Sequence, residues 1–312
     1  MASTAGCEAV ATKAPVYVWM WSIMAGNIDA KRSAALLELL KPERLPRILD
    51  VGANPLGWDR PPYQTLVEQG LCELWGVEPQ EDAYQKLLKT KRDNEHYLPN
   101  AIGQGGAATL HVFRNDAFSS LYPIHGPSID FIDRWRDETT LVQTIDLETH
   151  RIDDLSEMEN VDLLKIDCQG YEVEAMRGGQ KRLADAVAII PEVRFMQLYD
   201  GEPNIGGLDS YLRSRGFFFH KFLFVKSTGI NHSRFGKLPK DMTWNQAVDG
   251  DAVYIKNPVS PEMATEQVKY LAIFADAVFF SFELVIRCLD ILAARGVVTD
   301  ADIQGYVDRL VG

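Results

Sequence analysis

Short apolar runs alternate with amphipathic segments along most of the chain from residue 47 onward. Each apolar run is bounded by turn residues, which is typical of a strand buried on both faces of a parallel sheet. The runs span residues 46–53, 72–79, 96–103, 161–172 and 186–195. The segments between them have the spacing and end residues of helices, at residues 61–70, 81–94, 172–185 and 207–216. The alternation predicts an α/β fold with a doubly wound, mostly parallel sheet.

Other parts of the chain depart from this alternation. Residues 107–114 and 140–146 indicate added strands or a hairpin, and residues 217–227 and 251–257 indicate a late antiparallel pair. After Pro258 the pattern predicts two or three helices and no strand.

These changes in pattern divide the chain into three parts. We predict an N-terminal helical or irregular segment (1–46), a central domain (47–258) and a C-terminal helical appendage (259–312). The appendage could serve as a homodimer contact or as a lid.

Two apolar runs raise the question of a membrane span. The run from Val16 to Ala25 is too short, because a spanning helix needs about 20 residues. We expect it to pack on the domain as a helix or strand. The run from Leu271 to Ala294 is longer, but it carries four charged residues at near-helical spacing and predicts one buried amphipathic helix. These residues are Asp276, Glu283, Arg287 and Asp290.

Composition and charge exclude several classes of protein. Hydrophobic residues make up 46% of the chain and charged residues 24%, so a folded domain is expected. The net charge of −12 argues against binding to nucleic acid or to an anionic membrane, since both favour a basic face. The four cysteines have no zinc spacing and indicate reduced thiols in a cytoplasmic protein.

The candidate chemistry begins at two strand ends. The string RILDVGANPLG places Asp50 and Gly52 after one strand, and LWGVEPQ places Glu78 after the next. Such a pair can seat a nucleotide-like ligand, with the second acid at its ribose. The string lacks the GxGxxG glycines and there is no P-loop, so S-adenosylmethionine fits better than a dinucleotide or a nucleoside triphosphate. The alternative is an ordinary turn between strand and loop.

Further motifs along the chain resemble the FkbM-type methyltransferases, a branch of the class I S-adenosylmethionine-dependent methyltransferases. They are ILDVGAN, GVEPQ, LPNAIG, VQTIDLETHRIDDL, LLKIDCQGYEVEAMRGG and IIPEVRF, in the family's order. The resemblance implies a Rossmann-like sheet of seven mostly parallel strands, the last one antiparallel. It implies cofactor contacts at Asp50, Gly52, Ala53, Asn54, Glu78, Pro79, Asn100, Ala101 and Asp167. Here Pro55 and Leu56 move the usual glycine of the first loop to Gly57, so that loop is one residue longer.

Three acids are candidate catalytic residues. Asp167 follows the apolar strand LLKI and could act as general base, metal ligand or clamp on a substrate hydroxyl, although it could also cap the next helix. Glu172 lies in the first turn of that helix, where the helix dipole favours an acid in any case. Glu192 ends the fifth strand, and with Asp167 it could hold Mg²⁺, as paired acids do in some class I O-methyltransferases. Lys165 could point toward the pocket or beneath it, but a lysine that snorkels from its strand is the favoured expectation.

The sequence therefore predicts an S-adenosylmethionine-dependent O-methyltransferase. The resemblance implies a small-molecule or glycan acceptor, with the hydroxyl on a sugar, polysaccharide or natural product. Two alternatives stay open: a nicotinamide-dependent oxidoreductase on a similar sheet, and a non-catalytic scaffold. Loops 115–139 and 228–250 are expected to set acceptor specificity, but they carry no recognisable code.

Overall fold

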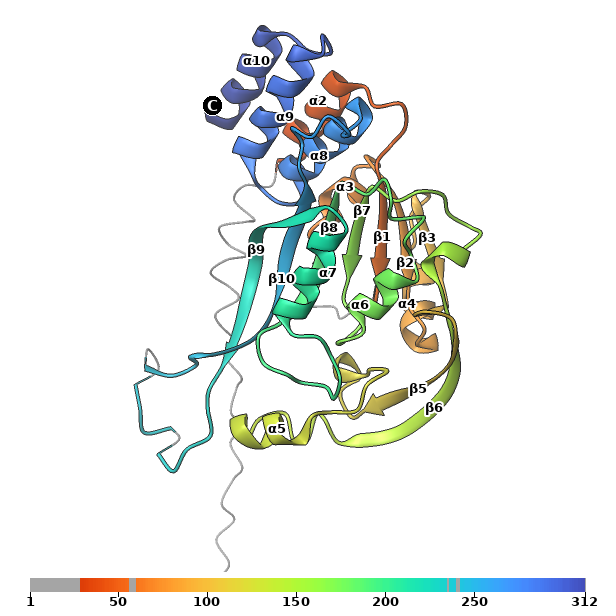
Figure 1. The fold of residues 1–312 in the computed structure, drawn as a ribbon, viewed down its shortest axis with the longest axis vertical. Coiled ribbons are helices and arrows are strands. Elements are labelled where there is room, and N and C mark those ends of the chain that lie inside the picture. Colours follow the sequence, from red (N-terminus) through yellow and green to blue (C-terminus); the bar gives the residue numbers. More distant parts are fainter. Residues whose placement is uncertain (1–28, 56–59, 235, 240–241, 312) are drawn as a thin grey trace, which may run out of the picture.

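A seven-stranded sheet forms the centre of the protein, seen in a computed structural model that describes residues 29–55, 60–234, 236–239 and 242–311. The strand order is β3-β2-β1-β7-β8-β10-β9 (Figure 1). Neighbouring strands are parallel, except that β10 is antiparallel to both β8 and β9. The predicted sheet is confirmed. Its strands are β1 (Arg47–Val51), β2 (Glu73–Val77), β3 (Glu95–Leu98), β7 (Leu163–Ile166), β8 (Ala188–Arg194), β9 (Phe217–Thr228) and β10 (Gln246–Lys256).

The strand order indicates where the ligand crevice lies. From β1 the chain moves outward to β2 and β3, then returns to the other side of β1 to form β7. The order therefore switches between β1 and β7, and ligands of doubly wound sheets bind outside the carboxyl ends of the strands at such a point.

Alternation along each strand produces one core on each face of the sheet. Leu49 and Leu164 face a core that also contains residues of α6 (Glu172–Arg177) and α7 (Ile205–Ser214). Ile48 and Leu163 face the opposite core, which contains residues of α3 (Gln64–Glu68) and of the helices at the two ends of the described chain. The remaining helix of this part of the domain, α4 (Glu81–Thr90), packs beside β3.

A second, three-stranded sheet lies beyond the carboxyl ends of the main sheet (Figure 1). It contains β4 (Ala101–Ile102), β5 (Gly106–Phe113) and β6 (Leu141–His150), with β5 and β6 antiparallel as expected. The prediction of one strand over residues 96–103 was wrong. Pro99 and Asn100 separate β3 from β4, because proline has no N–H to continue the ladder. Between β5 and β6 lie η1 (Asp116–Phe118) and α5 (Gly126–Ile132), and η2 (Ile152–Asp154) follows β6.

Four helices form a bundle at the amino ends of the parallel strands, at the top of Figure 1. They are α2 (Ala30–Leu40), α8 (Thr265–Ala277), α9 (Phe282–Ala294) and α10 (Asp300–Val311). The bundle shares one core with the first residues of the strands, such as Ile48 and Ala188. Its described helices lie at the end of the sheet opposite the ligand crevice, so they form no lid over it.

The prediction of one long helix over Leu271–Ala294 was wrong. The helix breaks between Ala277 and Phe282, where Phe280 has a left-handed φ of 51°. Two side chains of β9 hold this break: Lys221 Nζ donates to the Phe279 carbonyl at 3.0 Å, and His220 Nε2 lies 2.8 Å from Ser281 Oγ. Contacts from a distant strand thus divide a segment whose local pattern is continuous.

The helix predicted over residues 172–185 is also shorter than expected. α6 ends at Arg177, and Gly178 follows it in close contact with the backbone of Gly103, where an added Cβ would lie 2.2 Å from the Gly103 oxygen. Gly178, the first glycine of the pair behind KIDCQGYE, therefore lets the end of α6 pack against the loop after β4.

No helix in the described ranges is long and apolar enough to cross a bilayer. The run Val16–Ala25 and residue Gly57 lie outside the described residues.

Candidate active site

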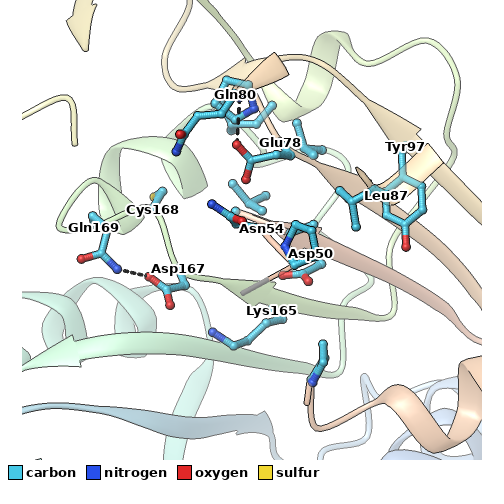
Figure 2. A pocket seen from close by; sticks show the side chains of 18 of the residues that line it. Asp50, Asn54, Glu78, Gln80, Leu87, Tyr97, Lys165, Asp167, Cys168 and Gln169 are labelled. Atoms are coloured by element: carbon cyan, nitrogen blue, oxygen red, sulfur yellow. Dashed lines mark hydrogen bonds between the residues drawn. The ribbon is translucent and has the colours of Figure 1, made fainter. Parts of the chain in front are cut away.

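A cavity of about 400 Å³ lies at the carboxyl ends of β1, β2 and β7. Small-molecule sites commonly have this volume. Figure 2 shows acidic and amide side chains from separate strands around one space. All nine predicted cofactor residues line it, namely Asp50, Gly52, Ala53, Asn54, Glu78, Pro79, Asn100, Ala101 and Asp167. Their individual contacts with a cofactor stay predictions.

The first loop is held by backbone packing. Gly52 has a φ of 86°, and a Cβ at this position would lie 2.0 Å from the backbone oxygen of Asp167. The sequence suggested that this glycine lets a ligand approach. The structure gives a second reason, since only glycine lets the ends of β1 and β7 pass so closely.

Asp50 is buried beside this loop, and the Tyr63 hydroxyl donates a hydrogen bond to it. Burial, with a further effect of the Asp50 charge, raises the pKa of Tyr63 well above its ordinary value. Tyr63 therefore stays protonated and keeps its role as a donor. No signal in the sequence distinguishes Tyr63 from the other aromatic residues, because the segment between Asp50 and Tyr63 has no regular pattern.

Glu78 is a buried acid of the cavity whose hydrogen-bonding capacity is mostly unused. Only 3% of the residue is exposed, and one carboxylate oxygen accepts from the backbone N–H of Gln80 at 2.8 Å (Figure 2). No second donor to Glu78 exists among the described residues. Burial raises its pKa from 4.5 to about 7, helped by the charges of Asp50 and Asp116. A carboxylate that is buried and has spare acceptor capacity suits the hydroxyl pair of a ribose.

Four charged residues from neighbouring strands form a polar band on one face of the sheet. Asp50 pairs in register with Lys165, and Glu192 pairs with Asp251. Lys165 pairs with Ile190, two residues before Glu192, so all four side chains lie on the same face. They lie on the same face of the sheet as apolar residues nearer to the helical bundle, such as Ile48 and Leu163.

The prediction that Lys165 snorkels to solvent was wrong. The residue is buried, and its Nζ lies 3.4 Å from Asp251 Oδ1. Burial alone would lower the pKa of Lys165, but the negative charges of Asp251, Asp167, Asp50 and Glu192 outweigh it and raise the pKa. The cavity floor therefore carries a permanent ammonium.

Asp167 directly follows β7 and points toward the cavity (Figure 2). The Gln169 side-chain amide donates to its carboxylate at 2.6 Å. Burial favours the neutral acid, but the positive charges of Lys165 and Arg194 prevail and lower its pKa. Asp167 is therefore an ionised acceptor, and the alternative that it caps the next helix has no hydrogen bond to support it, since α6 has no side-chain cap.

Gln169 is a residue that the sequence did not single out. Its amide nitrogen donates to Asp167, and its amide oxygen accepts from Arg194 at 2.9 Å and from the Tyr199 hydroxyl at 2.9 Å. Its backbone oxygen accepts from Ser120 Oγ at 2.6 Å. Gln169 thus connects Asp167 to three other segments, and no local pattern could have revealed contacts that span 25 to 49 residues.

The other two candidate catalytic acids do not line the cavity. Glu172 Oε1 accepts from the backbone N–H groups of Cys168 at 3.0 Å and Gly170 at 3.1 Å. Burial raises its pKa to about 7. Glu192 is bonded to Arg194 at 2.6 Å, and burial raises its pKa despite that guanidinium. Both acids support the turn that carries Asp167.

The donor set does not fit Mg²⁺. Oxygens of Asp167, Glu172 and Glu192 lie within 4.8 Å of one another. However, the guanidinium of Arg194, the amide of Gln169 and two backbone N–H groups already occupy them. Mg²⁺ requires near-octahedral oxygen ligands and usually keeps several waters, and Arg194 holds this space instead.

The methyltransferase FkbM domain model matches residues 50–219, which is more than half of the chain. The chain belongs to the FkbM methyltransferase family. Membership supports methyl transfer from S-adenosylmethionine, the cofactor expected from the sequence, and disfavours the oxidoreductase alternative. The match includes every residue of the cavity discussed above except Asp251.

Solved structures show only distant similarity to this FkbM methyltransferase. Precorrin-6y C5,15-methyltransferase from Geobacter metallireducens GS-15 has 11% identity and a TM-score of 0.34, with 72% of this chain and 87% of that chain covered. Magnesium protoporphyrin IX methyltransferase from Synechocystis PCC 6803, solved with bound SAM, has 11% identity and a TM-score of 0.32, with 78% and 92% covered. No curated protein matches the sequence significantly. These similarities identify no acceptor.

Proposed function

We propose that this FkbM methyltransferase transfers a methyl group from S-adenosylmethionine to a hydroxyl of a sugar, polysaccharide or natural product. The observation that carries the proposal is Asp167, an ionised carboxylate that points into the cavity and is fixed by Gln169. A hydroxyl needs an acceptor for its proton as it attacks, whereas a thiolate does not.

The cofactor would be held at the ends of β1 and β2. S-adenosylmethionine, when bound, supplies an activated methyl group on a sulfonium. Glu78 would accept from the ribose hydroxyls, Asn100 and Ala101 would lie near the adenine, and the loop from Asp50 to Asn54 would meet the amino acid end. The buried acids of this region favour a ligand that carries positive charge.

Asp167 would act on the acceptor as a clamp. Its carboxylate accepts the hydrogen bond of the attacking hydroxyl and so turns an oxygen lone pair toward the methyl group. Because Lys165 and Arg194 lower its pKa, Asp167 is a weak base before reaction. The proton therefore moves to Asp167 as the new C–O bond forms, when the hydroxyl has become acidic.

The test has two stages. Calorimetric titration of the purified chain with S-adenosylmethionine and S-adenosylhomocysteine should show binding of both, and absence of both would end the proposal. A transfer assay with tritiated cofactor against panels of hydroxyl, amine and thiol acceptors should then label hydroxyl compounds. Labelling of amines or thiols alone would retain the methyltransferase and reject O-methylation. Binding with no labelled acceptor would favour a non-catalytic scaffold.

A further inference from the structure

The β9–β10 hairpin extends past the edge of the sheet at which the cavity lies. Asp249 of β10 is paired with Arg194, the last residue of β8, while β9 continues to Thr228. The described residues of the connection (229–234, 236–239 and 242–245), which we call the hairpin tip, therefore project from the carboxyl edge. Figure 1 shows it at the lower left, away from the helical bundle.

The hairpin tip exposes large apolar side chains. In its described residues Ile230, Leu238, Met242 and Trp244 are all more than one-third exposed, and Met242 reaches 61%. The tip also contacts the segment around α5, since the Asn231 N–H donates to the Phe131 carbonyl at 3.2 Å. The Arg134 guanidinium lies 4.6 Å from the centre of the Trp244 ring. The exposed Phe131 side chain therefore belongs to the same part of the surface.

The hairpin tip is basic in an acidic protein. It contains Arg234 and Lys237 and no acid, whereas the whole chain has a net charge of −12. Arg234 and Lys237 are exposed and form no ion pair with any described residue. On the α5 side, Asp130 and Asp133 share Arg136, which leaves one negative charge, and the guanidinium of Arg134 over the Trp244 ring offsets it.

We propose that the hairpin tip binds the surface of an anionic phospholipid bilayer. Exposed apolar residues with a tryptophan and nearby bases are what an interfacial membrane contact uses, because the rings and alkyl groups enter the headgroup region while the bases meet anionic lipids. A soluble polyanion would attract the bases, but it would not account for Ile230, Leu238 and Met242 in contact with water.

This membrane contact is independent of the acceptor chemistry proposed above. The family match ends at residue 219, so the hairpin tip lies outside the matched domain. The contact departs from the expectation, drawn from net charge, that the protein binds no membrane. Net charge averages over the whole chain, whereas a bilayer responds to charges within about 10 Å of its surface. Because the tip and the cavity share one edge of the sheet, the contact would bring the cavity near the bilayer.

The test is sedimentation of the full chain with vesicles of phosphatidylcholine, alone or with about 30% phosphatidylglycerol. We expect binding to the anionic vesicles only, with weaker binding at high salt because screening shortens the reach of the bases. Arg234→Glu with Lys237→Glu should weaken binding by at least about 25-fold, since each base near the surface contributes about fivefold.

The apolar side chains are tested by Met242→Ser with Trp244→Ser. This pair should also reduce binding to the anionic vesicles. The matched control is Val259→Ser, which changes a side chain that is 51% exposed beyond β10 at the opposite edge of the sheet, and Lys181→Glu is the charge control. Both controls should bind like the original protein. S-adenosylmethionine affinity should stay within about twofold in all variants, which also shows that they fold.

Three outcomes would overturn the proposal. The first is no binding to either kind of vesicle. The second is binding that the tip variants leave unchanged. The third is retention on heparin without vesicle binding, which would assign the tip to a soluble polyanion.

Discussion

Two buried acids at opposite ends of the sheet differ in how completely the protein satisfies them. Asp276 of the helical bundle is fully buried and accepts from Arg32 Nε at 2.6 Å, Ser33 Oγ at 2.6 Å and Tyr306 Oη at 2.7 Å. Glu78 of the cavity is almost as buried, but within the described chain it accepts only from the N–H of Gln80.

The number of donors distinguishes acids that stabilise the fold from acids that remain available to a ligand. An acid that the protein saturates with donors fixes the elements that supply them, and Asp276 joins α2, α8 and α10 in this way. An acid that is left short of donors costs stability unless a ligand completes it. By the same criterion we expect Glu172 and Glu192, whose partners are protein groups, to support the site, and we propose Asp167 for the reaction.

The largest expected effect concerns the saturated acid. Asp276→Asn should lower the free energy of unfolding by about 3–5 kcal/mol, because Arg32 would lose its carboxylate partner inside the core. Urea unfolding measures this change. Asp290→Asn, on the exposed side of α9, is the matched control and should stay within about 0.5 kcal/mol. A loss below about 1 kcal/mol at Asp276 would show that saturation does not mark a structural acid.

The next effect concerns the acid that faces the acceptor. Asp167→Asn should lower turnover about 100-fold or more, since the hydroxyl loses its charged clamp and proton acceptor. Cofactor affinity should change less than about threefold. Steady-state kinetics with an acceptor from the hydroxyl panel, together with calorimetry, separate the two effects. If cofactor affinity falls as much as turnover, Asp167 belongs to the cofactor site and not to the reaction.

Glu78→Gln should have opposite effects on binding and on stability. Loss of the charged acceptor should weaken S-adenosylmethionine binding by about 10-fold or more. The ligand-free protein should become more stable at pH 8 by up to about 2–3 kcal/mol, because burial raises the pKa of Glu78 from 4.5 to about 7. That cost is absent below pH 4.5, where both states are protonated, and grows as the pH rises to about 7. A variant that is less stable at pH 8 would place Glu78 among the structural acids.

The smallest expected effect is on pH dependence. Because the pKa of Glu78 is about 7, its carboxylate becomes protonated below that pH and can no longer accept from both ribose hydroxyls. Cofactor affinity should therefore fall about 10-fold between pH 8 and pH 6, as measured by calorimetry. Glu172 has a pKa in the same range but does not line the cavity. The pH dependence should therefore disappear in Glu78→Gln, and its persistence there would assign it to another group.

Much of the fold could be predicted from the chain because its signals are local. The apolar runs around Leu49 and Leu164 and the turns after them mark the strands, and the ends of those strands locate Asp50, Glu78 and Asp167. The predictions were wrong where a distant segment changes a local element. Lys221 and His220 divide the helix after Leu271, and the Gly103 backbone limits α6.

The sequence by itself determined the α/β sheet, the family and the acids at the strand ends, because strand periodicity and short motifs are properties of neighbouring residues. Only the tertiary structure decided which acids are satisfied. The donors to Asp276 come from residues 30 to 244 positions away, and those that fix Asp167 through Gln169 come from three other segments. Whether a buried charge is complete depends on these contacts, and no local pattern records them.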